Sequence, residues 1–230
     1  QLNLLCSKQF LLRYLCRTIM RSGFVNIIGK PNAGKSTLLN AFIGEKLAIV
    51  SSKVQTTRHR IRAFLNGPDY QIVFSDTPGV IEPKYKLHEK MMHAVKSSME
   101  DADVCLLVAD LRDDLLELDN IFSSLKIKTN AILVLNKCDM VKQDRIEMAE
   151  AYFIDKPYCK KIITISAASK LHVDQLQNAI IDMLPEGEPF YDQEDLTDLP
   201  TRFFAGELIR EKIFELFDEE IPYQTTVMIS

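Results

Sequence analysis

Residues 29–37 read Gly29-Lys30-Pro31-Asn32-Ala33-Gly34-Lys35-Ser36-Thr37, and this stretch decides the fold that the sequence predicts. It follows the apolar run 24–28 and precedes residues 38–42, which have the pattern of a helix. A strand, a glycine-rich loop and a helix in this order match the phosphate-binding pattern G-x-x-x-x-G-K-[ST]. We therefore expect a loop whose backbone amides hold a polyphosphate at the start of a helix. An ordinary glycine-rich turn is the alternative, which the flanking strand and helix disfavour.

The residue types of this loop fit the contacts that a polyphosphate requires. Gly29 and Gly34 let the backbone turn tightly and come close to the phosphates. Lys35 is expected to reach the β- and γ-phosphates, and Ser36 to offer its hydroxyl to Mg²⁺. The loop residues expected to bind the nucleotide are Gly29, Asn32, Ala33, Gly34, Lys35, Ser36 and Thr37.

The composition is ordinary for a soluble globular protein of 230 residues, with 47% hydrophobic and 26% charged residues. The net charge of −4 is spread unevenly, because residues 1–21 carry basic residues and no acid, whereas residues 185–220 are rich in acids. Residues 22–184 are nearly neutral in sum. This part of the chain therefore lacks the basic footprint of a nucleic-acid-binding domain.

The number and spacing of the cysteines and the length of the apolar runs indicate in which cellular compartment the protein resides. The five cysteines are odd in number and include no C-x-x-C pair, which disfavours a disulfide scaffold or a zinc site. The longest uncharged apolar stretch falls far short of the roughly 18 residues that a membrane span needs. The four histidines share no metal-ligand spacing. We expect a soluble protein in a reducing compartment, the cytoplasm.

The segment 1–21 is an N-terminal extension of doubtful origin. Its leucines and isoleucine recur at helical spacing among basic residues, which fits an organellar transit segment, a surface-binding amphipathic segment or a plain packing helix. A further interpretation is that residues 1–20 precede the natural start, because the chain opens on Gln1 and Met20 stands just before the first strand. We favour this last interpretation and assign the segment no function.

Residues 22–184 alternate between apolar runs and helical patterns, which predicts an α/β domain with helices on both faces of a sheet. The hairpin signal at 66–69 makes one strand pair antiparallel in an otherwise parallel six-stranded sheet. Strands are expected near 23–28, 59–66, 70–75, 103–109, 131–136 and 161–165. Helices are expected near 35–43, 86–99, 115–126, 142–153 and 172–184.

A change of composition after Leu184 predicts a second unit. Residues 185–200 are rich in proline and acids and are expected to form a solvated linker. Residues 203–217 have the pattern of an amphipathic helix, and 225–229 that of the first part of a strand. We therefore expect 201–230 to begin a second domain that this chain leaves incomplete.

The sequence Asp76-Thr77-Pro78-Gly79 follows an apolar strand and supplies a carboxylate at its carboxyl end. Asp76 is expected to hold Mg²⁺ through water, and the Gly79 amide to face the γ-phosphate. A simple strand-ending turn is the alternative, because Asp, Pro and Gly all favour turns.

The sequence Asn136-Lys137-Cys138-Asp139 also ends a strand, and its last residue suits a guanine base. A carboxylate at Asp139 can accept from N1–H and N2–H₂ of guanine, whereas adenine offers no matching pair of donors. The alternative is that Asp139 caps a following helix. Ser166, Ala167 and Ala168 are expected to add backbone donors for the guanine O6.

The loop 44–58 contains a candidate for the last Mg²⁺ ligand. The hydroxyl of Thr57, or that of Thr56, is expected to join the metal only while a γ-phosphate is present, which would make the loop a switch. A solvated polar loop is the alternative.

These motifs, in this order, resemble the translation-factor-like GTPases of the TrmE-Era group. The closest resemblance is to the Era family, through GKPNAGKSTLLNAFIG at 29–44, QTTRHRI at 55–61, IREK at 209–212 and IPY at 221–223. The resemblance covers about residues 22–230 and implies a Ras-like P-loop GTPase domain followed by a KH domain, which here lacks its GXXG backbone clamp. It further implies binding to 16S rRNA, a role in 16S rRNA processing and 30S subunit assembly, and a peripheral association with the inner membrane. We expect a monomer.

One part of a common GTPase mechanism is absent, because Val80 follows Gly79 and cannot orient the attacking water as a glutamine would. Similar loops in the TrmE-Era group suggest that Asn32 helps to hold K⁺ beside the phosphates, in addition to GTP and Mg²⁺. The expected catalytic set is Asn32, Lys35, Thr57 and Gly79, and the expected Mg²⁺ set is Ser36, Thr57 and Asp76. A nucleotide-gated scaffold with negligible hydrolysis and an ATP-using P-loop kinase are the competing hypotheses.

Overall fold

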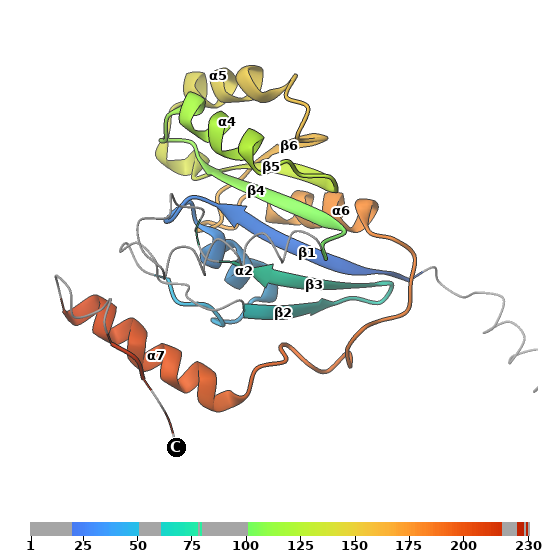
Figure 1. The fold of residues 1–230 in the computed structure, drawn as a ribbon, viewed down its shortest axis with the longest axis vertical. Helices are drawn as coiled ribbons and strands as arrows, with labels where there is room; N and C mark the ends of the chain where they lie inside the picture. Colours follow the sequence, from blue (N-terminus) through green and yellow to red (C-terminus); the bar gives the residue numbers. More distant parts are fainter. Residues whose placement is uncertain are drawn as a thin grey trace, which may run out of the picture.

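A computed structural model of the chain describes residues 20–50, 61–77, 79, 101–217, 225–227 and 229. Within them, six strands form one sheet in the order β2-β3-β1-β4-β5-β6 (Figure 1). Only β2 and β3 are antiparallel, and the other neighbours are parallel. The expected sheet is confirmed, and its strands are β1 (Arg21–Gly29), β2 (Ile61–Asn66), β3 (Tyr70–Asp76), β4 (Val104–Asp110), β5 (Asn130–Asn136) and β6 (Lys161–Thr164).

The described helices match the expected ones to within about two residues at their starts and ends. They are α2 (Lys35–Ile43), α4 (Leu115–Ser124), α5 (Gln143–Phe153), α6 (Val173–Met183) and α7 (Thr201–Leu216), with a short 3₁₀ helix η1 (Cys138–Met140). The helix expected at 86–99, residues 1–19 of the N-terminal segment and residues 59–60 of the second expected strand lie outside the described residues.

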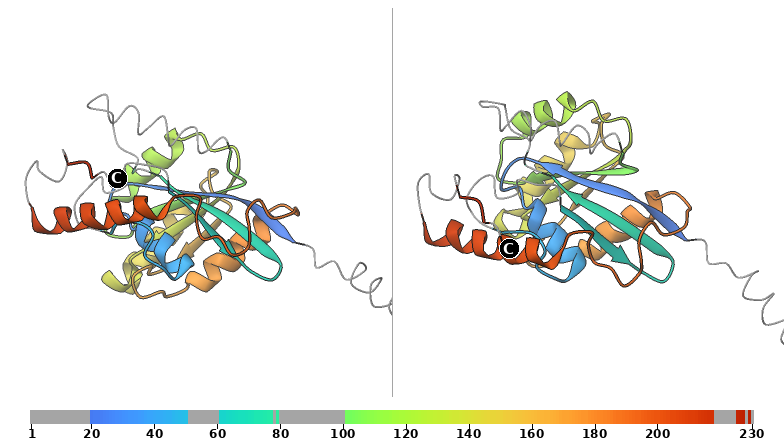
Figure 2. Two further views of the ribbon diagram at one scale, coloured as in Figure 1. Left: turned by 90° about the horizontal axis from the view of Figure 1, so that it is seen from below. Right: turned by 60° about the horizontal axis from the view of Figure 1, so that its bottom comes forward.

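The sheet is the middle of three layers, because both of its faces are apolar. On one face it packs against α2 and α6, and on the other against α4 and α5, so that two separate hydrophobic cores form. Figure 2 shows α4 on one side of the sheet and α2 with α6 on the other. Neighbouring residues in the central strands, such as Leu106 and Leu107, point into opposite cores and are both fully buried. This explains the uninterrupted apolar runs of the parallel strands.

The carboxyl ends of the parallel strands meet at one edge of the sheet, where ligands bind in folds of this kind. The register places Ile27 beside Asp76 and Asp110 beside Asn136. The strand ends therefore bring the first, second and third predicted motifs to the same edge.

The segment 185–200 is anchored to the sheet by its backbone, although its acidic side chains are exposed as expected for a solvated linker. The Gln71 amide oxygen accepts hydrogen bonds from the backbone amides of Phe190 (2.6 Å) and Tyr191 (3.0 Å). The ring of Tyr191 stacks on Phe64 with 3.9 Å between centroids, and the Phe64 amide donates to Leu196 O at 2.8 Å. The linker thus covers part of β2, which is one of the two edge strands of the described sheet.

Helix α7 lies beside the 46–49 segment, and residues of both line a small pocket. Beyond it, the expectation of a strand at 225–229 is wrong for the described residues 225–227 and 229, which form no strand. Val227 packs instead beside Gly206 of α7, where its carbonyl oxygen would lie 3.6 Å from a Cβ atom on Gly206. A strand is stable only when it pairs with others, and here the segment contacts a helix.

No helix in the described part of the chain combines the length and apolar character needed to cross a bilayer.

Candidate nucleotide-binding site

The loop between β1 and α2 has the backbone shape of a phosphate-binding loop. Gly34 has a φ of 95°, and a Cβ atom there would lie 2.2 Å from Asn136 Nδ2. At Gly29 a Cβ atom would lie 2.2 Å from Val108 O. Both positions therefore require glycine because other chain segments approach closely. The first turn of α2 carries no acidic residue, so its positive end is open to an anion.

Lys35 at the start of α2 is almost fully buried, with 6% of its surface exposed. Its Nζ donates to Gly29 O at 3.1 Å and to Lys30 O at 2.9 Å, so the side chain folds back over the loop. Burial lowers the pKa of Lys35 to about 8, although the nearby Asp76 carboxylate acts in the opposite direction. The buried Lys35 ammonium would be stabilised by a nearby negative charge, so it is suited to bind phosphate.

Ser36 and Asp76, the two described residues that are predicted to hold Mg²⁺, lie in contact with each other. The Ser36 hydroxyl donates to Asp76 Oδ2 at 2.7 Å, and Asp76 is completely buried at the end of β3. A hydroxyl and a carboxylate oxygen are hard donors of the kind that Mg²⁺ prefers, so this pair could hold the ion. Gly79 lies against the loop, because a Cβ atom there would be 2.7 Å from the nitrogen of Pro31.

Asn136 connects three of the predicted motifs through its buried side-chain amide. Its Nδ2 donates to Ala33 O at 2.9 Å, and its Oδ1 accepts from the Ala167 amide at 3.0 Å. The phosphate loop, the end of β5 and the 166–168 segment are thereby fixed to one another. The structure brings these motifs together as the sequence predicts.

Asp139 and the 166–168 segment lie on the same edge of the sheet. Asp139 is exposed and belongs to η1, whereas α5 begins at Gln143 with Lys142 as its N-cap residue. The alternative that Asp139 caps this helix is therefore wrong. Ser166 is buried, and its hydroxyl accepts a hydrogen bond from the Ser169 amide at 3.2 Å. Ala168 is exposed at the same turn.

Two further charged residues, which the sequence analysis missed, contact these loops. Asp110 ends β4 and accepts a hydrogen bond from Lys137 Nζ at 2.7 Å. Burial alone would raise the pKa of Asp110, but hydrogen bonds from Arg112 and Lys137 outweigh it and lower the pKa to about 2. Lys30 pairs with Glu117 at 2.9 Å and so ties the phosphate loop to α4. The sequence signal for Asp110 was its position as a polar residue at the end of an apolar run, which was also the signal for Asp76.

Some predicted residues lie outside the described part of the chain. These are Thr56, Thr57 and Val80, so their roles stay predictions. Thr37 lies in the first turn of α2 as expected.

Comparison with known proteins agrees with this geometry. Residues 24–137 match the model of a family described as 50S ribosome-binding GTPase. The GTPase Era of Clostridium botulinum is 42% identical over 213 residues, which are 92% of this chain and 72% of that protein. The GTPase Era of Alkaliphilus metalliredigens is 41% identical over 212 residues, which are 91% of this chain and 72% of that protein.

Two solved structures share both fold and sequence with this chain. A variant of Aquifex aeolicus Era bound to GDP and aluminium fluoride has a TM-score of 0.83 and 38% identity, over 88% of this chain and 70% of that one. Era in complex with MgGDPNP and nucleotides 1506–1542 of 16S ribosomal RNA has a TM-score of 0.84 and 38% identity, over 89% of this chain and 70% of that one. With the motifs in their predicted places and relatives of this similarity, the chain belongs to the Era family of GTPases.

Proposed function

We propose that this chain binds GTP with Mg²⁺ at the carboxyl edge of its sheet and hydrolyses it to GDP and phosphate. The observation that carries the proposal is the position of the Asn136 side chain, which bonds both to the Ala33 carbonyl and to the Ala167 amide. These bonds hold the phosphate loop and the two loops after β5 and β6 in one arrangement. A site that is already arranged loses little free energy to ordering when the nucleotide binds.

Phosphate binding falls to the first loop and the start of α2. Backbone amides of the loop and of the first turn of α2 would donate to the phosphates. Lys35, which donates to two loop carbonyls, would turn from them to neutralise the phosphate charge. Ser36 and Asp76 would hold Mg²⁺, which supplies charge stabilisation at the phosphates when it is bound. We assign a place in the same site to Thr57, as a metal ligand, and to the Gly79 amide, near the γ-phosphate. We further assign Asn32 to a K⁺ ion.

Base selection falls to Asp139, Lys137 and the 166–168 segment. The Asp139 carboxylate would accept two hydrogen bonds from guanine, and adenine would leave it without donors. A site that rejects a base for lacking a donor discriminates strongly, because its polar group would be left unpaired.

We further propose a role in 16S rRNA processing and 30S subunit assembly. One Era relative was solved with 16S rRNA nucleotides, and this chain aligns with 70% of that protein. Because residues 22–184 are nearly neutral in sum, we place the RNA contact outside the GTPase domain, in a KH-type domain that begins near residue 201. We also propose that the protein is cytoplasmic and associates peripherally with the inner membrane.

Phosphate release under single-turnover conditions tests the hydrolytic function. With excess protein over GTP and Mg²⁺ present, we expect phosphate to form slowly, to stop when EDTA removes Mg²⁺, and to be unaffected by excess ATP. Tight GTP binding without phosphate release would favour the nucleotide-gated scaffold, and competition by ATP would favour the kinase.

A further inference from the structure

Asp110 occupies a position from which it can control the loops that bind the nucleotide. It is the last residue of β4, directly beside Asn136 in the register of the sheet. Its side chain is 7% exposed, so its carboxylate is taken out of water and requires partners. One partner is Lys137, whose Nζ lies 2.7 Å from Oδ2.

Lys137 extends from that carboxylate across the phosphate loop. Its backbone has a φ of 65°, a left-handed conformation that is costly for a residue with a side chain. The Lys137 side chain passes Gly34, where a Cβ atom would lie 3.8 Å from Lys137 Cε. Its Nζ also donates to Asn32 O at 2.6 Å. Lys137 thus joins the two motifs, and Asp110 holds its ammonium group in this orientation.

The second partner of Asp110 is Arg112, which serves as a natural control. Its guanidinium donates to both carboxylate oxygens, with Nη2 at 2.7 Å from Oδ2. The Arg112 side chain is 46% exposed, and none of the contacts described for it reaches the phosphate loop. Loss of the Arg112 guanidinium would leave in place the hydrogen bonds that Lys137 donates to Asp110 and to Asn32 O.

We propose that Asp110 is a positioning residue for guanine-nucleotide binding, which acts by holding Lys137 across the phosphate loop. This inference rests on the proposed function, because it needs a nucleotide between the phosphate loop and the 136–139 loop. It goes further by assigning a role to a residue that does not itself have to contact the nucleotide. Its effect must therefore depend on Lys137.

A double-mutant cycle on the whole chain tests this dependence. The Kd and dissociation rate of a fluorescent GDP would be measured for the wild type, Asp110→Asn, Lys137→Met, the double variant and Arg112→Gln, with thermal melting of each. We expect Asp110→Asn to weaken GDP binding about tenfold, which is the loss of one charge-assisted hydrogen bond. In the Lys137→Met background the same change should have less than a twofold effect on Kd, and Arg112→Gln should stay within about twofold of the wild type.

Each outcome decides a different point. Wild-type affinity in Asp110→Asn, fully additive effects in the double variant, or an equal loss in Arg112→Gln would overturn the inference and leave the proposed function intact. A wild-type chain that binds no GDP would overturn the proposed function and the inference with it. If Asp110→Asn does not fold, Asp110→Glu keeps the charge but displaces it, so faster GDP release is expected and unchanged release contradicts the inference.

Discussion

At the scale of single residues, Lys35 is the group whose ionisation should report nucleotide binding. Burial lowers its pKa to about 8. A phosphate placed beside Nζ favours the charged form and raises the pKa again. Near pH 8 the Lys35 side chain is therefore partly deprotonated in the free protein and fully protonated in the complex.

GDP binding at pH 8 should thus take up about half a proton per chain, and the affinity should fall as the pH rises further. Isothermal titration in two buffers of different ionisation enthalpy measures this uptake directly. Around pH 7 the uptake from Lys35 should be much smaller, which provides the control. Identical binding enthalpies in both buffers at pH 8 would show that Lys35 does not face the phosphates.

Asn32 allows a second test at this scale. It is exposed on the phosphate loop and has a φ of 60°, so its backbone conformation can also be adopted by glycine. If its side chain helps to hold K⁺, GTP turnover should be about tenfold faster in KCl than in NaCl, because a fixed cation stabilises the transition-state charge. Asn32→Gly keeps the backbone shape and should remove this difference. Equal turnover of the wild type in both salts would exclude the ion.

The sequence predicted where most of the described candidate residues lie, because each motif follows an apolar strand. Asp76 and Asn136 lie where the strand–motif pattern places them, and their hydrogen bonds connect the expected partners. Asp110 was missed because its role depends on Lys137, which lies 27 residues away in the sequence and reaches it only in the folded sheet. Asp110 belongs to no recognisable sequence motif, so the sequence alone does not indicate that Lys137 is its partner.

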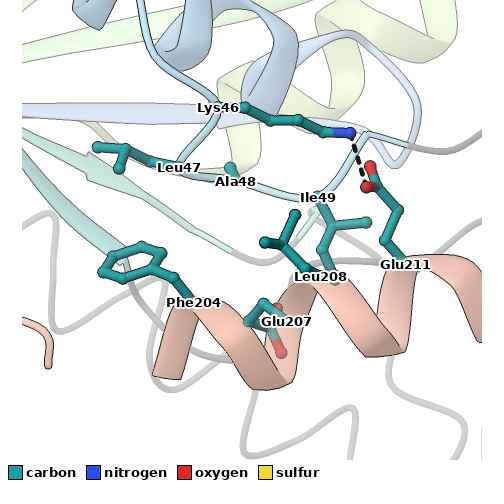
Figure 3. Close-up of a pocket in the computed structure, with 8 residues that line it drawn as sticks. All are labelled: Lys46, Leu47, Ala48, Ile49, Phe204, Glu207, Leu208 and Glu211. Atoms are coloured by element: carbon teal, nitrogen blue, oxygen red, sulfur yellow. Dashed lines mark ion pairs between the residues drawn. The ribbon is translucent and has the colours of Figure 1, made fainter. Parts of the chain in front are cut away.

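At the scale of elements, α7 contacts the 46–50 segment through an ion pair and a hydrogen bond. Figure 3 shows Lys46 extending toward Glu211 of α7, and their Nζ and Oε2 atoms are 2.6 Å apart. Glu211 is 1% exposed, and its Oε1 accepts from the Val50 amide at 3.2 Å. The helix is thereby tied to the chain just before the segment that contains Thr56 and Thr57.

Removing this carboxylate should destabilise the protein. We expect Glu211→Ala to lower the free energy of unfolding by about 1–3 kcal/mol, because the Val50 amide loses its acceptor. Glu211→Gln, which still offers an acceptor, should cost less. Urea denaturation measures both, and Lys212→Ala on the exposed face of α7 provides the matched control, with no measurable change expected. A Glu211→Ala variant as stable as the control would contradict the contact.

Helices and strands were predicted correctly where their own sequence pattern determines them. Alternation and apolar runs located all six described strands, and the hairpin at 66–69 gave the one antiparallel pair. The strand expected at 225–229 was wrong for the described residues of that range, because Val227 packs on α7, a tertiary contact that no local pattern contains. The anchoring of the linker depends on Gln71, whose amide bonds to residues about 120 positions later.

At the scale of the whole molecule, the loops after β1, β3, β5 and β6 lie at one edge of the sheet, so a nucleotide bound there would contact all four at once. A ligand that bridges these loops in the folded state only must stabilise the entire domain. At a GDP concentration 100 times its Kd, this stabilisation should be about 2.7 kcal/mol. The central claim is that the ligand is selected by its guanine base through Asp139.

Equilibrium competition between GDP, ADP and xanthosine diphosphate, on the wild type and on Asp139→Asn, tests this claim most directly. We predict that the wild type prefers GDP to ADP by at least about a hundredfold, because adenine leaves the carboxylate without donors. Asp139→Asn should instead prefer xanthosine diphosphate, because its amide can donate to the extra carbonyl of xanthine. Equal binding of GDP and ADP by the wild type, or a preference for GDP that Asp139→Asn retains, would contradict the account.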